Sequence, residues 1–177
     1  MKADLSVQYG KLIAALTSSD LSLMNDIEQQ LSEKFGECDL ISELFSFSDF
    51  TDYYAPEMGE NLQKKFLCFS EMILLEDLPD IKHVTNDVEQ QYAVNDKRRI
   101  NIDPGYVIHS QMVLTTTKGF SHRIYLGKGM YAELTYLCKG KGFYPLEWTY
   151  PDYRERLAIE FFGEVRKKYL QQIRSKR

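Results

Sequence analysis

Apolar and polar positions in the first part of the chain alternate between strand-length runs and helical spacings. Residues 10–17, 40–48 and 66–75 are apolar-rich runs of the length of a buried or half-buried strand. Between the first two runs, apolar side chains recur at intervals of three, four and four over residues 24–35. The same spacing returns after the third run, over residues 81–92. This spacing marks one face of an α-helix. The pattern therefore predicts a strand, a helix, two strands and a second helix.

A short fourth strand is predicted at residues 98–102, followed by the turn-forming tripeptide 103–105 (DPG). Together these elements give the β-α-β-β-α-β order of the ferredoxin-like fold, an antiparallel sheet with helices on one face. Residues 49–61, between the second and third strands, are rich in turn-forming residues and predict a long loop.

The rest of the chain predicts an extension of this sheet. Residues 107–117 fit a strand or a helix equally well. Residues 122–126 and 130–138 flank a glycine-rich loop and predict a β-hairpin. Residues 143–149 would add a third strand to form a meander, and a long amphipathic helix is predicted at about residues 154–174.

The whole chain, residues 1–177, is therefore predicted to be a single α+β domain. Its ferredoxin-like core covers about residues 10–103. The β-meander and the long C-terminal helix cover about residues 107–175, with the second turn of the meander at residues 139–142. A chain of this length buries roughly 70% of its unfolded surface, which is enough for a core without disulfides or metals.

Composition narrows the class of protein. Apolar residues make up 44% of the chain, which excludes wholesale disorder. The three cysteines lie far apart with no CxxC pair, which argues against a disulfide framework or a structural zinc site and fits a reducing compartment. The longest fully apolar run, residues 12–16, is too short for a membrane span or a signal peptide. We therefore expect a cytoplasmic protein with no membrane partner.

Charged and aromatic residues are unevenly distributed. Residues 1–115 contain 9 basic and 20 acidic side chains, whereas residues 116–177 contain 13 basic and 6 acidic ones. Nine aromatic residues lie between positions 120 and 153. A basic, aromatic-rich segment can bind RNA, because cations neutralise phosphates and rings stack on bases. Much of this charge falls on the predicted C-terminal helix and complements its dipole, so RNA binding is the weaker interpretation.

The predicted hairpin has one polar side. With a three-residue loop at 127–129, Arg123 lies opposite Glu133 and Tyr125 opposite Tyr131, all on the same side of the sheet. The apolar residues of the hairpin then point to the other side, toward the core. The polar side is interpreted either as an exposed surface with an ion pair across the strands or as the floor of a ligand pocket.

Further candidates lie near the predicted turns. Asp103 and Tyr106 flank the predicted DPG turn, where a carboxylate often faces a cleft, although Asp103 could simply close the turn. The segment 115–118 (TTTK) combines hydroxyl donors with a cation, which suits phosphate or carboxylate binding. His122 is the best acid–base candidate because its neighbours are polar, but in this register it points away from Glu133, as a core residue would.

The segment before the C-terminal helix has two interpretations. Thr149 and Asp152 have the spacing of a helix capping box, and the aromatic rings beside them could form the wall of a pocket. The complete set of ligand-binding candidates is Asp103, Tyr106, Thr117, Lys118, His122, Arg123, Tyr125, Tyr131, Glu133, Trp148, Asp152 and Tyr153.

Familiar enzyme signatures are absent from the sequence. The chain lacks GxxxxGK[ST], GxGxxG, HExxH and GxSxG motifs. Asp49 and Asp52 are weak candidates for binding a hard cation, and a solvated acidic loop explains them as well. The sequence identifies no cofactor and leaves open whether the protein catalyses a reaction.

Five longer strings lie in order along the chain: SDFTDYY (48–54), EMG (57–59), NIDPGY (101–106), TTKGFSHRIYLGKGMYAE (116–133) and WTYPDYR (148–154). Together they resemble a prokaryotic domain-of-unknown-function family, number 4416, over nearly the whole chain. The resemblance implies a stand-alone, single-domain cytoplasmic protein of about this size, and it assigns no catalytic residue.

From these residues we expect a binding module for a small anionic or polar ligand, nucleotide-like or phosphate-like, on a sheet face near residues 103–106. One alternative is a metal-dependent hydrolase or phosphotransferase that uses Asp103, Glu133 and His122. The other alternative is a module that binds RNA or protein and catalyses no reaction. The sequence does not indicate an oligomeric state.

Overall fold

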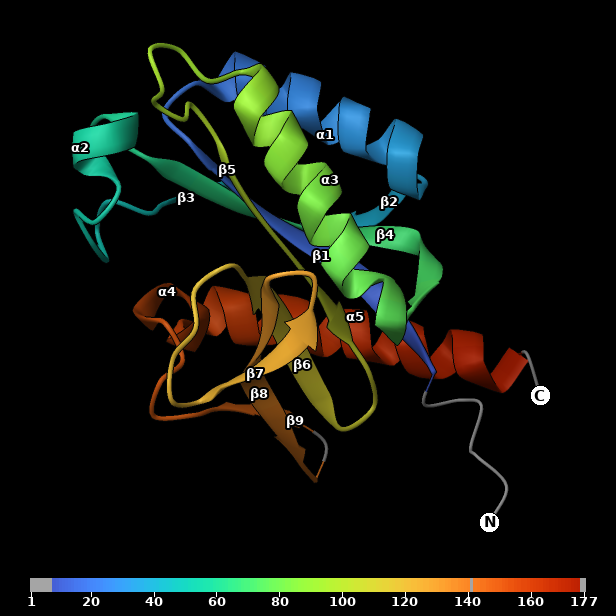
Figure 1. Ribbon diagram of the computed structural model, residues 1–177. Helices are drawn as coiled ribbons and strands as arrows, with labels where there is room; N and C mark the ends of the chain where they lie inside the picture. Colours follow the sequence, from blue (N-terminus) through green and yellow to red (C-terminus); the bar gives the residue numbers. More distant parts are fainter. Residues whose placement is uncertain (1–7, 141, 176–177) are drawn as a thin grey trace.

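Figure 1 shows the computed structural model of the chain, which describes residues 8–140 and 142–175. In these residues, nine strands form one sheet in which every pairing is antiparallel. The strands are β1 (Tyr9–Ser18), β2 (Cys38–Ile41), β3 (Phe45–Ser46), β4 (Gln63–Leu74), β5 (Asn101–Val107), β6 (Gln111–Thr116), β7 (Arg123–Gly127), β8 (Met130–Lys139) and β9 (Gly142–Pro145). Their main order is β2-β4-β1-β5-β6-β8-β7, with β3 beside β4 and β9 beside β8.

Two layers of helices enclose the sheet (Figure 1). The helices are α1 (Leu21–Phe35), α2 (Ala55–Met58), α3 (Leu78–Gln91), which follows the 3-10 turn η2 (Leu75–Asp77), α4 (Pro151–Arg154) and α5 (Arg156–Ser175). α1 and α3 pack on one face, where Leu12 and Leu16 of β1 are buried. α5 packs on the opposite face, against Ile13 and Ala15 of the same strand. Because β1 is covered on both faces, its sequence is a continuous apolar run rather than an alternating one.

The α+β class, the antiparallel sheet and the C-terminal helix are confirmed. The helix predicted from the spacing over residues 24–35 is α1, and Asp20 is its N-cap, which accepts a hydrogen bond from the Leu23 N–H. The sheet continues past β5 into β6, β8 and β7 and has nine strands. The ferredoxin-like topology therefore remains a prediction.

The predicted turn at residues 103–105 is wrong, because these residues lie inside β5. β6 pairs with β5 only from Gly105 onward, and proline is tolerated where a strand edge has no partner. At Gly105 the backbones of β5 and β6 approach closely, so that a Cβ there would collide with the carbonyl oxygen of Val113. Proline and glycine therefore mark the point where β6 separates from β5.

The strand predicted at residues 40–48 is divided into β2 and β3, which both pair with β4. Between them Ser42 keeps contact with β4, since its N–H donates to the Phe66 carbonyl and its hydroxyl accepts from the Phe66 N–H. Glu43 and Leu44 bulge outward and are exposed.

Other boundaries differ in smaller ways. The predicted loop at residues 49–61 contains α2, β4 begins three residues earlier than predicted, and the ambiguous residues 107–117 contain β6. The third meander strand is shorter, and α4 precedes the C-terminal helix. The predicted turn at residues 139–142 includes Lys141, which lies outside the described residues.

Both predicted cross-strand pairs of the polar side of the hairpin are confirmed: Arg123 with Glu133, and Tyr125 with Tyr131. The turn is different, because an irregularity at Leu126 lets Gly127 pair with Met130. The prediction that the apolar side of the hairpin faces the core is also wrong at Ile124, whose side chain is 71% exposed. β7 is the last strand of the sheet order, so the sheet provides no further strand to cover it.

Candidate functional site

A cavity of about 720 Å³ opens between the sheet, α3 and two loops. It occupies the wedge that forms where β6 separates from β5 beyond Gly105 and Leu114. Residues 47–54 and 150–153 contribute to its wall from outside the sheet. The volume lies in the range of small-molecule sites.

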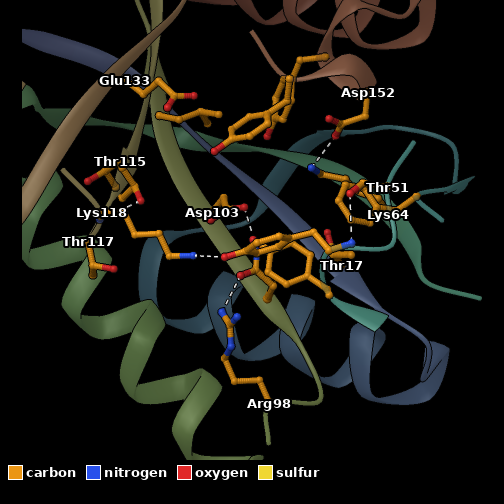
Figure 2. A pocket seen from close by; sticks show the side chains of 18 of the residues that line it. Thr17, Thr51, Lys64, Arg98, Asp103, Thr115, Thr117, Lys118, Glu133 and Asp152 are labelled. Atoms are coloured by element: carbon orange, nitrogen blue, oxygen red, sulfur yellow. Dashed lines mark hydrogen bonds and ion pairs between the residues drawn. The ribbon is translucent and has the colours of Figure 1, made fainter. Parts of the chain in front are cut away.

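The wall combines aromatic rings, hydroxyl groups and balanced charges (Figure 2). Its cations are Lys64, Lys82, Arg98 and Lys118, and its carboxylates are Glu89, Asp103, Glu133 and Asp152. Its hydroxyl groups belong to Thr17, Thr51, Thr115, Thr116, Thr117, Tyr53, Tyr54, Tyr150 and Tyr153. This lining offers hydrogen bonds of both polarities together with apolar surfaces for stacking.

Two side chains of α3 form hydrogen bonds with β5 where β6 does not pair with it. Lys82 donates to the Ile102 carbonyl at 2.7 Å, and Glu89 accepts from the Ile102 N–H at 2.6 Å. The backbone N–H and C=O of Ile102 are thus satisfied on the edge of β5 that β6 leaves open. Burial of Glu89 raises the pKa of its carboxyl group.

Arg98 joins three elements at one end of the cavity. Its guanidinium binds Glu57, at the end of α2, through two hydrogen bonds of 2.7 and 2.8 Å. The same group donates to Glu89 at 3.2 Å and to Asn101 at 2.8 Å. Arg98 also lies over the Tyr54 ring, 5.5 Å from its centroid. These contacts fix the residue 47–59 segment against α3 and β5.

Replacing Glu57 with Gln should loosen this segment in a pH-dependent way. Hydrogen bonds from Arg98 lower the pKa of Glu57 below its ordinary value of 4.5. The ionised carboxylate therefore stabilises the fold above that ordinary value, and the contribution is lost as the pH falls through the lowered pKa. At pH 7 we expect E57Q to be less stable by about 1 kcal/mol.

Urea unfolding of wild type and E57Q, at neutral pH and in mild acid, measures this effect. The difference between the two proteins should shrink as the pH falls. A difference that stays constant would contradict the role of the ionised carboxylate.

Lys64 and Asp152 form a buried ion pair on the opposite side of the cavity. The Lys64 Nζ lies 2.6 Å from Asp152 Oδ2, and the two side chains are 4% and 3% exposed. The ammonium group also lies 4.8 Å from the centroid of the Phe47 ring and 4.6 Å from that of Tyr153. The pair connects β4 to α4 and thereby closes this side of the wedge.

Asp103 lies in the middle of the wedge (Figure 2). Its Oδ2 accepts a hydrogen bond of 2.7 Å from Asn101, and its Oδ1 lies 3.5 Å from the Lys82 Nζ. The side chain remains 30% exposed. Asp103 therefore presents a partly free carboxylate to the cavity.

Glu133 lines the cavity from β8 and is buried, with 3% of its side chain exposed. Its Oε2 accepts a hydrogen bond of 2.6 Å from Arg123 and lies 3.2 Å from His122 Nε2. The imidazole of His122 stacks on Trp148, with centroids 5.0 Å apart. Burial opposes the charge of Arg123, but the hydrogen bonds and charge interactions with Glu133 and Tyr150 together outweigh burial and raise the pKa of Arg123. Glu133 is therefore held firmly through one oxygen.

Three buried polar atoms in the cavity wall have no hydrogen-bond partner among the described residues. They are Thr115 Oγ1, Glu133 Oε1 and the Tyr153 hydroxyl. Burial raises the pKa of Tyr153 well above its ordinary value, so its phenol stays neutral. Each unsatisfied buried polar atom costs about 1–3 kcal/mol. All three atoms belong to residues that line the same cavity.

Lys118 and Tyr53 form an exposed part of the lining. The Lys118 Nζ donates to the Tyr53 hydroxyl at 2.7 Å and thereby lowers the pKa of that phenol. Unlike the other three cations of the wall, Lys118 forms no ion pair with any carboxylate in the described part of the chain. Its charge remains available to an anionic ligand.

The structure brings half of the predicted ligand-binding residues to the cavity. They are Asp103, Thr117, Lys118, Glu133, Asp152 and Tyr153. Arg123, His122 and Trp148 do not line the cavity. Arg123 and His122 contact the Glu133 carboxylate, and Trp148 stacks on His122. Tyr106, Tyr125, Tyr131, Asp49 and Asp52 do not line the cavity.

Two local predictions are wrong. His122 was expected to point away from Glu133, but it precedes β7 in a turn and reaches the Glu133 carboxylate. Thr149 and Asp152 do not form a capping box: the Thr149 hydroxyl donates to the Thr135 carbonyl, and Asp152 pairs with Lys64. The long-range partners outcompete the local ones.

Sequence reasoning missed Lys64, Lys82, Glu89 and Arg98. Lys64 and Lys65 directly precede the apolar residues 66–69 of β4, a signal that does not distinguish the two lysines. Lys82 and Glu89 lie seven residues apart, two turns along α3, which places them on one helix face. The sequence does not show that this face meets an unpaired strand.

The described residues contain no group of three or more His, Cys, Asp or Glu side chains placed to hold a metal ion. The three cysteines form no disulfide. Among the described helices, none has the length and apolar character needed to cross a membrane.

Comparison with known families identifies the class of this chain. Residues 8–169 match the family model described as Domain of unknown function (DUF4416). The chain therefore belongs to this family, as the sequence strings predicted. No curated protein and no solved structure matches the chain significantly.

Proposed function

We propose that the cavity binds a small polar ligand, anionic in part and nucleotide-like or phosphate-like. The supporting observation is the presence of three unsatisfied buried polar atoms, of Thr115, Glu133 and Tyr153, in the wall of one cavity of about 720 Å³. Native proteins leave few buried polar groups unpaired. A ligand with several polar groups would satisfy all three.

The rest of the lining supports the same class of ligand. The ring of Tyr54 lies in the cavity wall, as do those of Tyr53 and Tyr150, and such rings suit stacking on a base or a sugar. Lys118 and the hydroxyl groups of residues 115–117 suit a phosphate or a carboxylate. We also propose that the unit from β1 to β5 is a ferredoxin-like core that carries this site at its β5 edge.

A thermal-shift screen of nucleotides and phosphorylated metabolites tests the proposal. A ligand present at about 100 times its Kd adds about 2.7 kcal/mol of stability. In a chain of this size that raises the Tm by roughly 5–10 °C. No shift with any compound at millimolar concentration would contradict the proposal.

A variant that fills the cavity provides the specific control. Asn86 of α3 lines the cavity and is half-buried, whereas its neighbour Asp87 is exposed and does not line it. N86W should abolish the Tm shift, and D87W should preserve it. A ligand that stabilises both variants equally binds elsewhere.

A second candidate is a hydrolase or phosphotransferase with Asp103, Glu133 and His122 as acid–base groups. The contact of 3.2 Å between His122 and Glu133 favours it, as does the position of Asp103 in the same cavity. Incubation of the compounds that bind, with and without divalent cations, tests it. Unchanged compounds after prolonged incubation would leave binding as the better description.

A further inference from the structure

Glu133 has one oxygen engaged and one oxygen free. Both of its partners, Arg123 and His122, meet Oε2, while Oε1 is buried without a partner among the described residues. An ionised carboxylate has no proton, so it only accepts hydrogen bonds. The molecule that completes the shell of Oε1 must therefore donate an O–H or N–H group to it.

The same carboxylate discourages a purely anionic ligand. The cavity wall carries four cations and four carboxylates, and three of the cations already pair with carboxylates. An anion without donor groups could not donate a hydrogen bond to the negative oxygen of Glu133. It would also be repelled by it, because like charges repel at short range. Phosphate-binding character alone therefore does not describe this site.

Glu133 and Lys118 both line the cavity and are close enough for one small ligand to contact both. Glu133 pairs with Leu114 of β6, and Lys118 follows four residues later along the chain. The chain bends at Thr117, and the Lys118 carbonyl accepts a hydrogen bond of 2.9 Å from the same Arg123 guanidinium that binds Glu133. Thr115 lies between them and can donate or accept.

We propose that Glu133 is a specificity-determining residue, and that the ligand carries a hydroxyl or amino donor for Glu133 together with an anionic group for Lys118. Sugar phosphates and nucleotides have this chemistry. Anions without donors lack it. This inference rests on the proposed function, because it concerns the same cavity.

Probes of related charge test the inference by calorimetry and thermal shift at pH 8. Glucose 6-phosphate and AMP carry both donor groups and a phosphate, whereas phosphoenolpyruvate and sulfate carry negative charge without donors. We expect the first two to bind wild type at least tenfold more tightly than the second two.

The variant E133Q tests the residue itself. Gln keeps the shape of Glu, but an amide oxygen that accepts from Arg123 turns its NH₂ group toward the cavity, where it donates instead of accepting. Affinity for the donor-bearing probes should fall about 10–100-fold, the effect of losing a hydrogen bond to a charged group. The control E147Q removes the same charge from an exposed position that does not line the cavity, and it should bind like wild type.

The outcomes separate this inference from the proposed function. Equal binding of both kinds of probe, or unchanged binding by E133Q, overturns the role of Glu133 while ligand binding stands. Binding of no probe and no screened compound overturns the proposed function, and this inference with it. If E133Q does not fold, the comparison of probes on wild type still decides.

Discussion

Replacement of Lys64 by Met should lower the free energy of unfolding by about 3–5 kcal/mol. Lys64 and Asp152 are both almost fully buried and lie 2.6 Å apart. Without Lys64, the Asp152 carboxylate stays in an apolar environment with no compensating cation, and an uncompensated buried charge is costly. Urea unfolding measures the loss directly.

The neighbouring residue Lys65 provides a matched control. It pairs at 2.5 Å with Glu28, whose side chain is 25% exposed. Water can therefore solvate the Glu28 carboxylate when the ion pair is lost. K65M should cost about 1 kcal/mol or less. The double variant K64M/D152L should recover much of the stability that K64M loses. Equal losses in K64M and K65M would contradict the account of the buried pair.

Replacement of Arg98 by Met should cost about 2–3 kcal/mol, the value of hydrogen bonds to charged groups. The substitution removes the cation that pairs with Glu89, whose side chain is 5% exposed, and releases Glu57 at the end of α2. Both α2 and the wall of the cavity should loosen. Urea unfolding and limited proteolysis of residues 47–59 measure the two effects.

Arg99 is the control for this prediction. It pairs with Asp20 at 2.6 Å, but the two side chains are 45% and 38% exposed. R99M should therefore cost less than about 1 kcal/mol. R98K should recover only part of the loss, because an ammonium group cannot reproduce the two parallel bonds to Glu57. A fully stable R98M would contradict the role given to this network.

The order of strands and helices in the first half could be predicted because it depends on local periodicity. The spacing of Met24, Ile27 and Leu31 predicted α1. The turn at residues 103–105 was wrong for a tertiary reason. Local propensity favours a turn there, but the pairing of β5 with β1 continues through these residues and outweighs it.

The candidate site was only partly predictable, because its shape depends on where β6 leaves β5. Asp103, Lys118 and Glu133 could be named from their polarity near predicted turns and strand faces. Lys64 and Lys65 look alike in the sequence. What distinguishes them is the partner of Lys64, Asp152, which lies 88 residues further along the chain.

The central claim is that the cavity between β5 and β6 binds a small polar ligand. A crystal structure of the protein soaked with the compound that raises the Tm most tests it directly. We predict density for that compound inside the cavity, with a donor group about 2.7–3.2 Å from Glu133 and an anionic group beside Lys118. Density for the compound elsewhere on the surface, with solvent alone in the cavity, would contradict the claim.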